Sequence, residues 1–309
     1  MKRWMKGMLA AAVVCMAAGT AVCGVAWAMG GRFSHYRHKR YGITAEDRTE
    51  PESEREEVLQ KENRISPDDP GRRVYAESKP FQETEKTYGG WLMIEGNPIK
   101  ELEITVGGLY AEVIFDEEAE EITVDLSNDD YRYDQEVDDD TLKIHVRKRK
   151  DTFDALSDFD QSGDIGAVIR IPAGCVFQDV ELEVNGGMLL VGGITADTLD
   201  LELKAGGLEV VNSNVGELNG DCKAGELFYE GTVQRQIEAD CSAGTIEYAL
   251  TGSETDFNYE LEKEMGSIVI NGTERGQFDK KEVVNHPGAG KKAELECKVG
   301  AVSINFSEP

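Results

Sequence analysis

The sequence predicts an all-β fold, a β-solenoid of stacked rungs about 19 residues long with two strand zones in each rung. Three observations support this prediction. Apolar residues recur without insertion in four successive copies, as at Val184, Leu203, Cys222 and Cys241. Within each copy, apolar residues alternate with polar ones, which is typical of a half-buried strand. A glycine also recurs and is expected to form a tight turn at positive φ between the two strand zones. These glycines are Gly187, Gly206, Gly225 and Gly244.

The amino-terminal region is predicted to anchor the chain in a membrane. Residues 1–6 are short and basic, and residues 7–31 carry no charge. Such a stretch can cross a bilayer as a helix. It is longer than the apolar core of a signal peptide, which favours an uncleaved anchor, while Ala26-Trp27-Ala28 keeps a cleaved signal as the alternative. We therefore expect a single-pass protein of the bacterial cell membrane whose β-domain lies outside the cytoplasm.

Residues 32–89 are predicted to be a basic juxtamembrane stretch followed by a charged linker. The part from Glu46 to Arg73 is dense in charge and poor in apolar residues, so it cannot bury a core. We expect this segment to be a spacer between the anchor and the β-domain.

The β-domain is predicted to span residues 90–309, with its regular rungs at 178–250. Before the rungs, strand-like runs alternate with two polar excursions, at 129–140 and 150–164. After them, two looser copies of the repeat are separated by a loop at 271–292. Irregularity at both ends is expected, because terminal rungs must cover the open edges of the stack.

The outward positions of the repeat form a column of acids. Side chains alternate across a strand, so the residues that flank the inward apolar pair must face solvent. Thirteen of these fourteen positions are acidic, and Asn219 is the exception. We name the set the acidic ladder. Its members are Glu101, Glu103, Glu181, Glu183, Asp200, Glu202, Asn219, Asp221, Glu238, Asp240, Glu260, Glu262, Glu294 and Glu296.

Like charges on neighbouring strands destabilise a sheet, so the acidic ladder requires compensation. Divalent cations such as Ca²⁺ or Mg²⁺ could bridge adjacent rungs. A cationic peptide or a basic protein surface could lie along the ladder. The basic run at 147–150 could also pack across it. The alternative is a solvated face whose charge prevents aggregation.

Few other residues suggest a metal-binding or catalytic site. Asp158, Asp160 and Ser162 match the first half of a calcium loop, but its twelfth position is Ile169, inside a predicted strand. The four histidines lack zinc-ligand spacing, and no catalytic motif is present. We therefore expect no enzyme and no bound cofactor. The net charge of −27 disfavours nucleic acid as a partner.

Cys222 and Cys241 occupy the same inward position of adjacent rungs. The simplest interpretation is that they are small, buried, apolar residues of the core. A disulfide between rungs or a redox role is the alternative.

The repeated inward pair, glycine and inward apolar residue, together with the strand that ends in Ile169-Arg170-Ile171-Pro172, resembles a known bacterial family. This is the family of β-strand-repeat domains of unknown function labelled putative adhesin, and the resemblance spans about Leu102 to Phe306. It implies a β-solenoid of the cell envelope, tethered to the membrane, with links to envelope stress and cationic antimicrobial peptides. It implies no catalytic residues.

Three functions are consistent with these features. The first is a non-enzymatic, membrane-anchored binding domain that presents the acidic ladder to a cationic partner or to divalent cations. The second is a scaffold on the cytoplasmic side of the membrane that self-associates end to end through its terminal rungs. The third is a carbohydrate-active solenoid enzyme, which the many equivalent carboxylates disfavour because a glycosidase needs two acids in different environments.

Overall fold

The computed structural model describes residues 91–94, 97–149, 165–277 and 280–307. Among them, strands account for almost all regular structure, and one short 3-10 turn, η2, covers Glu254–Asp256. The predicted anchor, the predicted linker and the half calcium motif at Asp158–Ser162 lie outside the described residues. In the described part of the chain, no helix is long and apolar enough to cross a membrane.

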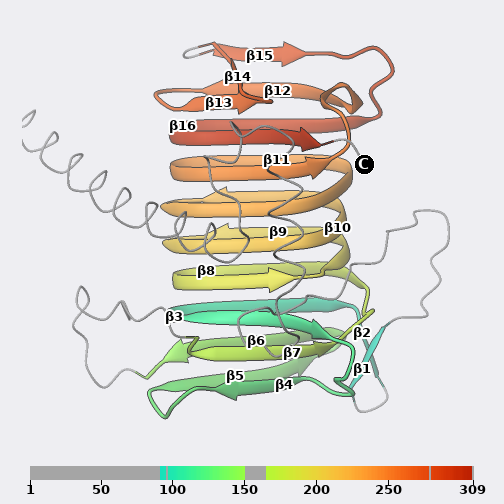
Figure 1. Ribbon diagram of the computed structural model, residues 1–309, viewed down its shortest axis with the longest axis vertical. Coiled ribbons are helices and arrows are strands. Elements are labelled where there is room, and N and C mark those ends of the chain that lie inside the picture. Colours follow the sequence, from blue (N-terminus) through green and yellow to red (C-terminus); the bar gives the residue numbers. More distant parts are fainter. Residues whose placement is uncertain (1–90, 95–96, 150–164, 278–279, 308–309) are drawn as a thin grey trace, which may run out of the picture. The chain divides into compact units, whose positions relative to one another are not determined.

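The regular rungs are stacked in parallel, as the period predicts (Figure 1). Paired residues are one period apart, so that Leu201 lies between Leu182 and Gly220. The residues that the sequence placed inward, such as Leu182 and Cys222, are fully buried. The strands of this region are β8 (Phe177–Gly192), β9 (Thr195–Leu203), β10 (Gly206–Cys222) and β11 (Gly225–Thr251).

Each rung has two strand zones, and the core lies between them. In β8, residues 177–184 belong to the front zone, which carries the acidic ladder, and residues 188–191 belong to the back zone. The core between the zones is narrow: Tyr248 in the back zone approaches the front zone so closely that a Cβ on Gly220 would clash with its hydroxyl. This explains why one inward position of the front zone is a glycine.

Glycine corners join the front zone to the back zone. Gly187, Gly206 and Gly225 have φ angles of 102°, 113° and 124°. A Cβ on Gly206 would overlap the carbonyl oxygen of Gly187, one rung below. Gly244 differs from the prediction because its φ lies outside the left-handed region, although a Cβ there would still lie 2.6 Å from the Gly225 oxygen. At β8 and β11 the corner is a bend inside a continuous strand and not a tight turn.

The amino-terminal end of the solenoid departs from chain order. β3 (Glu101–Asp116) pairs with β8 on one side and with β6 (Thr141–Lys148) and β7 (Ala167–Pro172) on the other. Two antiparallel strands complete this end, β5 (Tyr131–Asp138) beside β6 and β4 (Thr123–Leu126) beside β7. The prediction of a polar excursion at 129–140 was therefore wrong. Its residues are polar because β5 is an edge strand, exposed at every position after Tyr131.

The carboxyl-terminal end repeats this arrangement. β16 (Lys291–Ser307) inserts between β11 and the pair β12 (Phe257–Lys263) and β13 (Ser267–Ile270). β15 (Lys280–Val284) then pairs antiparallel with β12, and β14 (Thr273–Arg275) with β13. The predicted loop at 271–292 thus contains two strands. A separate hairpin joins β1 (Leu92–Ile94) and β2 (Asn97–Ile99).

Candidate binding face: the acidic ladder

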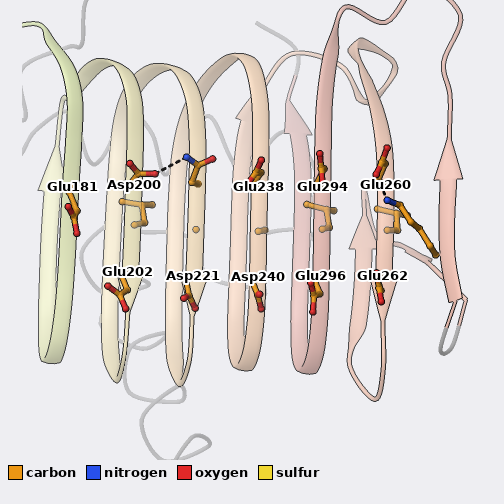
Figure 2. A pocket seen from close by; sticks show the side chains of 17 residues that line it. Glu181, Asp200, Glu202, Asp221, Glu238, Asp240, Glu260, Glu262, Glu294 and Glu296 are labelled. Atoms are coloured by element: carbon orange, nitrogen blue, oxygen red, sulfur yellow. Dashed lines mark hydrogen bonds and ion pairs between the residues drawn. The ribbon is translucent and has the colours of Figure 1, made fainter.

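The strand register arranges the acidic ladder into two columns that run along the stacking axis (Figure 2). Each column takes one residue from the front zone of every rung, and neighbouring strands are about 4.8 Å apart. The first column is Glu103, Glu181, Asp200, Asn219, Glu238, Glu294 and Glu260. The second column is Glu183, Glu202, Asp221, Asp240, Glu296 and Glu262.

Two details of the predicted ladder require correction. Because β16 inserts beside β11, Glu294 precedes Glu260 in space although it follows it in sequence. At the other end, Glu103 pairs with Glu181, two residues away from the expected alignment with Glu183. Glu101 consequently lies outside both columns, opposite Asp179. The same two-residue offset is present in the back zone, where Leu109 pairs with Gly187 and not with Leu189.

An open groove of about 700 Å³ runs along the two columns. Carboxylates from six strands line it, and inward residues between the columns, such as Leu201 and Ala239, contribute to its wall. Figure 2 shows the side chains of both columns along the same face of successive rungs. The groove therefore presents a long anionic surface of regular spacing.

Lysines at the corners compensate the second column. Lys204 contacts Glu183 and lies 3.8 Å from Glu202. Lys223 lies 2.6 Å from Glu202 and 3.6 Å from Asp221. In the inserted strand, Lys298 bridges Asp240 at 3.5 Å and Glu296 at 3.1 Å. Each of these lysines directly follows the last inward residue of the front zone, so each reaches the carboxylates on its own strand and on the neighbouring one.

These lysines were not predicted from the sequence. A signal was present, because Lys204 and Lys223 occupy the same rung position one residue after Leu203 and Cys222. Within the described residues, the two arginines of the basic run at 147–150 contact residues outside the acidic ladder. Arg147 forms an ion pair with Asp134 of the edge strand β5, and Arg149 donates a hydrogen bond to the Asp129 carbonyl oxygen.

The first column is compensated at its ends but not in its middle. Lys143 lies 3.3 Å from Glu103 at one end, and Lys292 and Lys281 contact Glu294 and Glu260 at the other. Between them, amides replace cations. Asn219 donates a hydrogen bond to Asp200 at 2.7 Å, and Gln236 donates one to Glu238 at 2.6 Å. Within the described residues, no cation forms an ion pair with the three middle carboxylates, Glu181, Asp200 and Glu238.

Burial and neighbouring charges shift the pKa values of carboxylates in both columns. Desolvation by burial, reinforced by the charges of Glu103 and Asp200, raises the pKa of Glu181. Burial and the charge of Glu296 likewise raise the pKa of Asp240. Burial also opposes ionisation of Glu183, but the contact with Lys204 outweighs it, and the pKa of Glu183 is lowered.

Comparison with known proteins identifies the fold family. The family model described as Toastrack DUF4097 matches residues 99–274, more than half of the chain. The chain belongs to the Toastrack DUF4097 family. A solved structure of a putative cell adhesion protein from Clostridium sporogenes is also similar, with 15% sequence identity and a TM-score of 0.39. That similarity covers 70% of this chain and 97% of the other. No curated protein matches the sequence.

The Toastrack match includes most of the acidic ladder but ends before β15 and β16. The strand that carries Glu294 and Glu296 is thus outside the matched residues, although it completes the groove. Among the described residues of this Toastrack protein, no group of three or more His, Cys, Asp or Glu side chains could hold a metal ion. The acidic columns are therefore arranged as a surface and not as a chelating cage.

Proposed function

We propose that this Toastrack protein is a non-enzymatic, membrane-anchored protein of the bacterial cell envelope, an adhesin-like binding domain whose acidic ladder binds a cationic partner. The partner is a lysine- or arginine-rich peptide segment or a basic protein surface. Residues 7–31 supply the membrane anchor, and the β-domain lies outside the cytoplasm. The observation that carries this proposal is the uncompensated middle of the first column.

The chain offers lysines to most carboxylates of the second column but to none of Glu181, Asp200 and Glu238 within the described residues. These three acids line one groove at rung spacing. A basic segment along the groove would favour the ionised form of Glu181, whose pKa is raised by burial and by the charges of Glu103 and Asp200. The expected binding is modest and salt-dependent, because exposed ion pairs contribute only about 0.2–1 kcal/mol each and salt screens them.

Two alternatives receive less support. Divalent cations need several converging oxygen ligands, and the described residues hold no such cluster. End-to-end association needs an open strand edge, whereas β5, β4, β15 and β14 cover the four edges with short or exposed antiparallel strands. Such edges are typical of chains that avoid edge-to-edge pairing.

The binding proposal is tested by titrating the full chain in detergent with a fluorescent oligolysine peptide. The triple variant Glu181→Gln, Asp200→Asn, Glu238→Gln should bind about tenfold more weakly, because each lost carboxylate contributes about 0.5 kcal/mol. The matched control removes three exposed acids elsewhere, through Glu117→Gln, Glu118→Gln and Glu121→Gln. Equal affinity of the two triple variants would contradict the ladder as the binding site.

The envelope location needs a separate experiment. Protease treatment of intact cells should digest residues 91–307 if the domain is outside the cytoplasm. Digestion only after lysis would exclude the external location, and it would leave the peptide-binding result unaffected.

A further inference from the structure

The period that aligns the acids also aligns three thiols inside the solenoid. Cys222, Cys241 and Cys297 occupy paired positions on β10, β11 and β16, with Cys241 in the middle. All three are fully buried and free. The insertion of β16 brings Cys297 beside Cys241, although 56 residues of sequence separate them. We name these residues the thiol column.

The spacing of the thiol column disfavours a disulfide and suits a bridging ion. Paired side chains on adjacent parallel strands point the same way and are about 4.8 Å apart. A disulfide requires its Cβ atoms to lie about 3.5–4.5 Å apart, so it would have to pull two rungs together. Two metal–sulfur bonds of about 2.3 Å each span about 4.6 Å, close to the rung spacing.

The strand register makes the middle cysteine the residue that two alternative pairs would share. Cys241 pairs with Cys222 on one neighbouring strand and with Cys297 on the other. The Cys222 thiol donates a hydrogen bond to the Gly225 carbonyl oxygen at 3.7 Å.

The thiol column lies directly beneath the glycine corners. A Cβ on Gly244 would lie 2.8 Å from the Cys222 sulfur, and a Cβ on Gly266 would clash with the Cys297 sulfur. A layer of glycine backbone without side chains thus borders these two sulfurs.

A second buried polar group lies near the thiol column. The Tyr248 hydroxyl, from the back zone of β11, is fully buried and has no hydrogen-bond partner among the described residues. A buried hydroxyl without a partner is costly. A thiolate held nearby by a metal ion would offer it an acceptor.

We propose that the thiol column binds one soft monovalent cation, of the Cu(I) or Ag(I) class, between Cys241 and one flanking cysteine. On binding, the S–H bond of Cys241 breaks and its proton leaves to solvent, while the flanking thiol donates a lone pair and keeps its proton. One cation and one thiolate leave the site neutral, which a buried core requires. Soft sulfur ligands select Cu(I) over hard cations, and two ligands do not suit the tetrahedral preference of zinc.

The test uses Ag(I) as a redox-inert probe and the full chain in detergent. All variants carry Cys15→Ser, Cys23→Ser and Cys175→Ala, so that the thiol column supplies the remaining cysteines. Native mass spectrometry counts the bound ions, and competition with a small thiol chelator ranks the affinities. The parent should bind one ion, and Cys222→Ala or Cys297→Ala alone should retain it, because each leaves one pair with Cys241.

Cys241→Ala and the double variant Cys222→Ala, Cys297→Ala should each weaken binding by more than about 100-fold. This loss exceeds the one expected when a residue that only supports a metal ligand is removed. The double variant keeps Cys241, so it tests the pairing even if Cys241→Ala fails to fold. Circular dichroism confirms the fold of each variant. Parent-like affinity in either of these variants, or a disulfide within the thiol column of air-purified protein, would overturn the proposal.

Discussion

The regular rungs and the two ends of the solenoid pair their strands in different ways. In β8 to β11, each strand pairs with its sequence neighbours in parallel, one period apart. At the ends, a strand distant in sequence inserts next to the regular rungs, and antiparallel strands cover the edges. The middle thus shows how a repeat propagates, and the ends show how it stops. Stopping requires a break in the period, because another identical rung would leave an open edge.

The largest expected effect concerns the inserted strand β16. Leu295 is buried between Ala239 of β11 and Leu261 of β12. Leu295→Asp would place an unpaired carboxylate in the core, so we expect a loss of more than about 4 kcal/mol in unfolding free energy, measured by denaturant titration. Val283→Asp on the edge strand β15, where Val283 is 54% exposed, should change stability by less than about 0.5 kcal/mol. Similar losses in both variants would mean that the inserted strand does not support the end.

A smaller effect is expected at a corner of the regular rungs. Gly206→Ala forces a side chain into positive φ and against the Gly187 carbonyl, so we expect a loss of about 3 kcal/mol in unfolding free energy. Gly186→Ala is the matched control, because a Cβ there has no neighbour within 4 Å. The control should unfold at nearly the parental denaturant concentration. If the two variants are equally stable, the corner does not depend on glycine.

The smallest effects separate two acids of the ladder. At pH 7, Glu181→Gln should stabilise the fold by up to about 1 kcal/mol, since it removes a carboxylate whose pKa is raised by burial and repulsion. Glu183→Gln should destabilise it by a similar amount, since Lys204 loses the nearer of its two carboxylate partners. Thermal unfolding of both variants and the parent measures these differences.

The pH dependence of these two variants should have opposite signs. The folded pKa of Glu181 is raised, so its protonated form stabilises the fold, and that gain disappears as pH rises through the folded pKa. The advantage of Glu181→Gln over the parent should therefore vanish on acidification. The folded pKa of Glu183 is lowered, so its contribution exists above the unfolded pKa and is lost as pH falls through the folded value. A parallel pH response of the two variants would contradict this assignment.

Much of the site followed from sequence because of its periodicity. The period placed Asp200 opposite Glu181 and Asp221 opposite Glu202, and the structure pairs them within these columns. The role of the compensating lysines was harder to predict from sequence. It depends on the corner geometry, which directs the side chains of Lys204 and Lys223 back over the carboxylates. The offset of Glu103 from Glu183 depends on the register in which β3 pairs with β8, and alternation alone does not reveal it.

The sequence by itself determined the rung, its inward residues and the alignment of acids from Glu181 to Asp240, because all of these depend on contacts one period apart. Only the tertiary structure decided which strands lie next to the regular rungs. It placed β3 and β16 there, and thereby set Glu294 beside Glu238 and Cys297 beside Cys241. Such contacts join segments far apart in the chain, and their energy depends on which edge remains open once the regular rungs have formed. A local sequence pattern does not determine which strand occupies that edge.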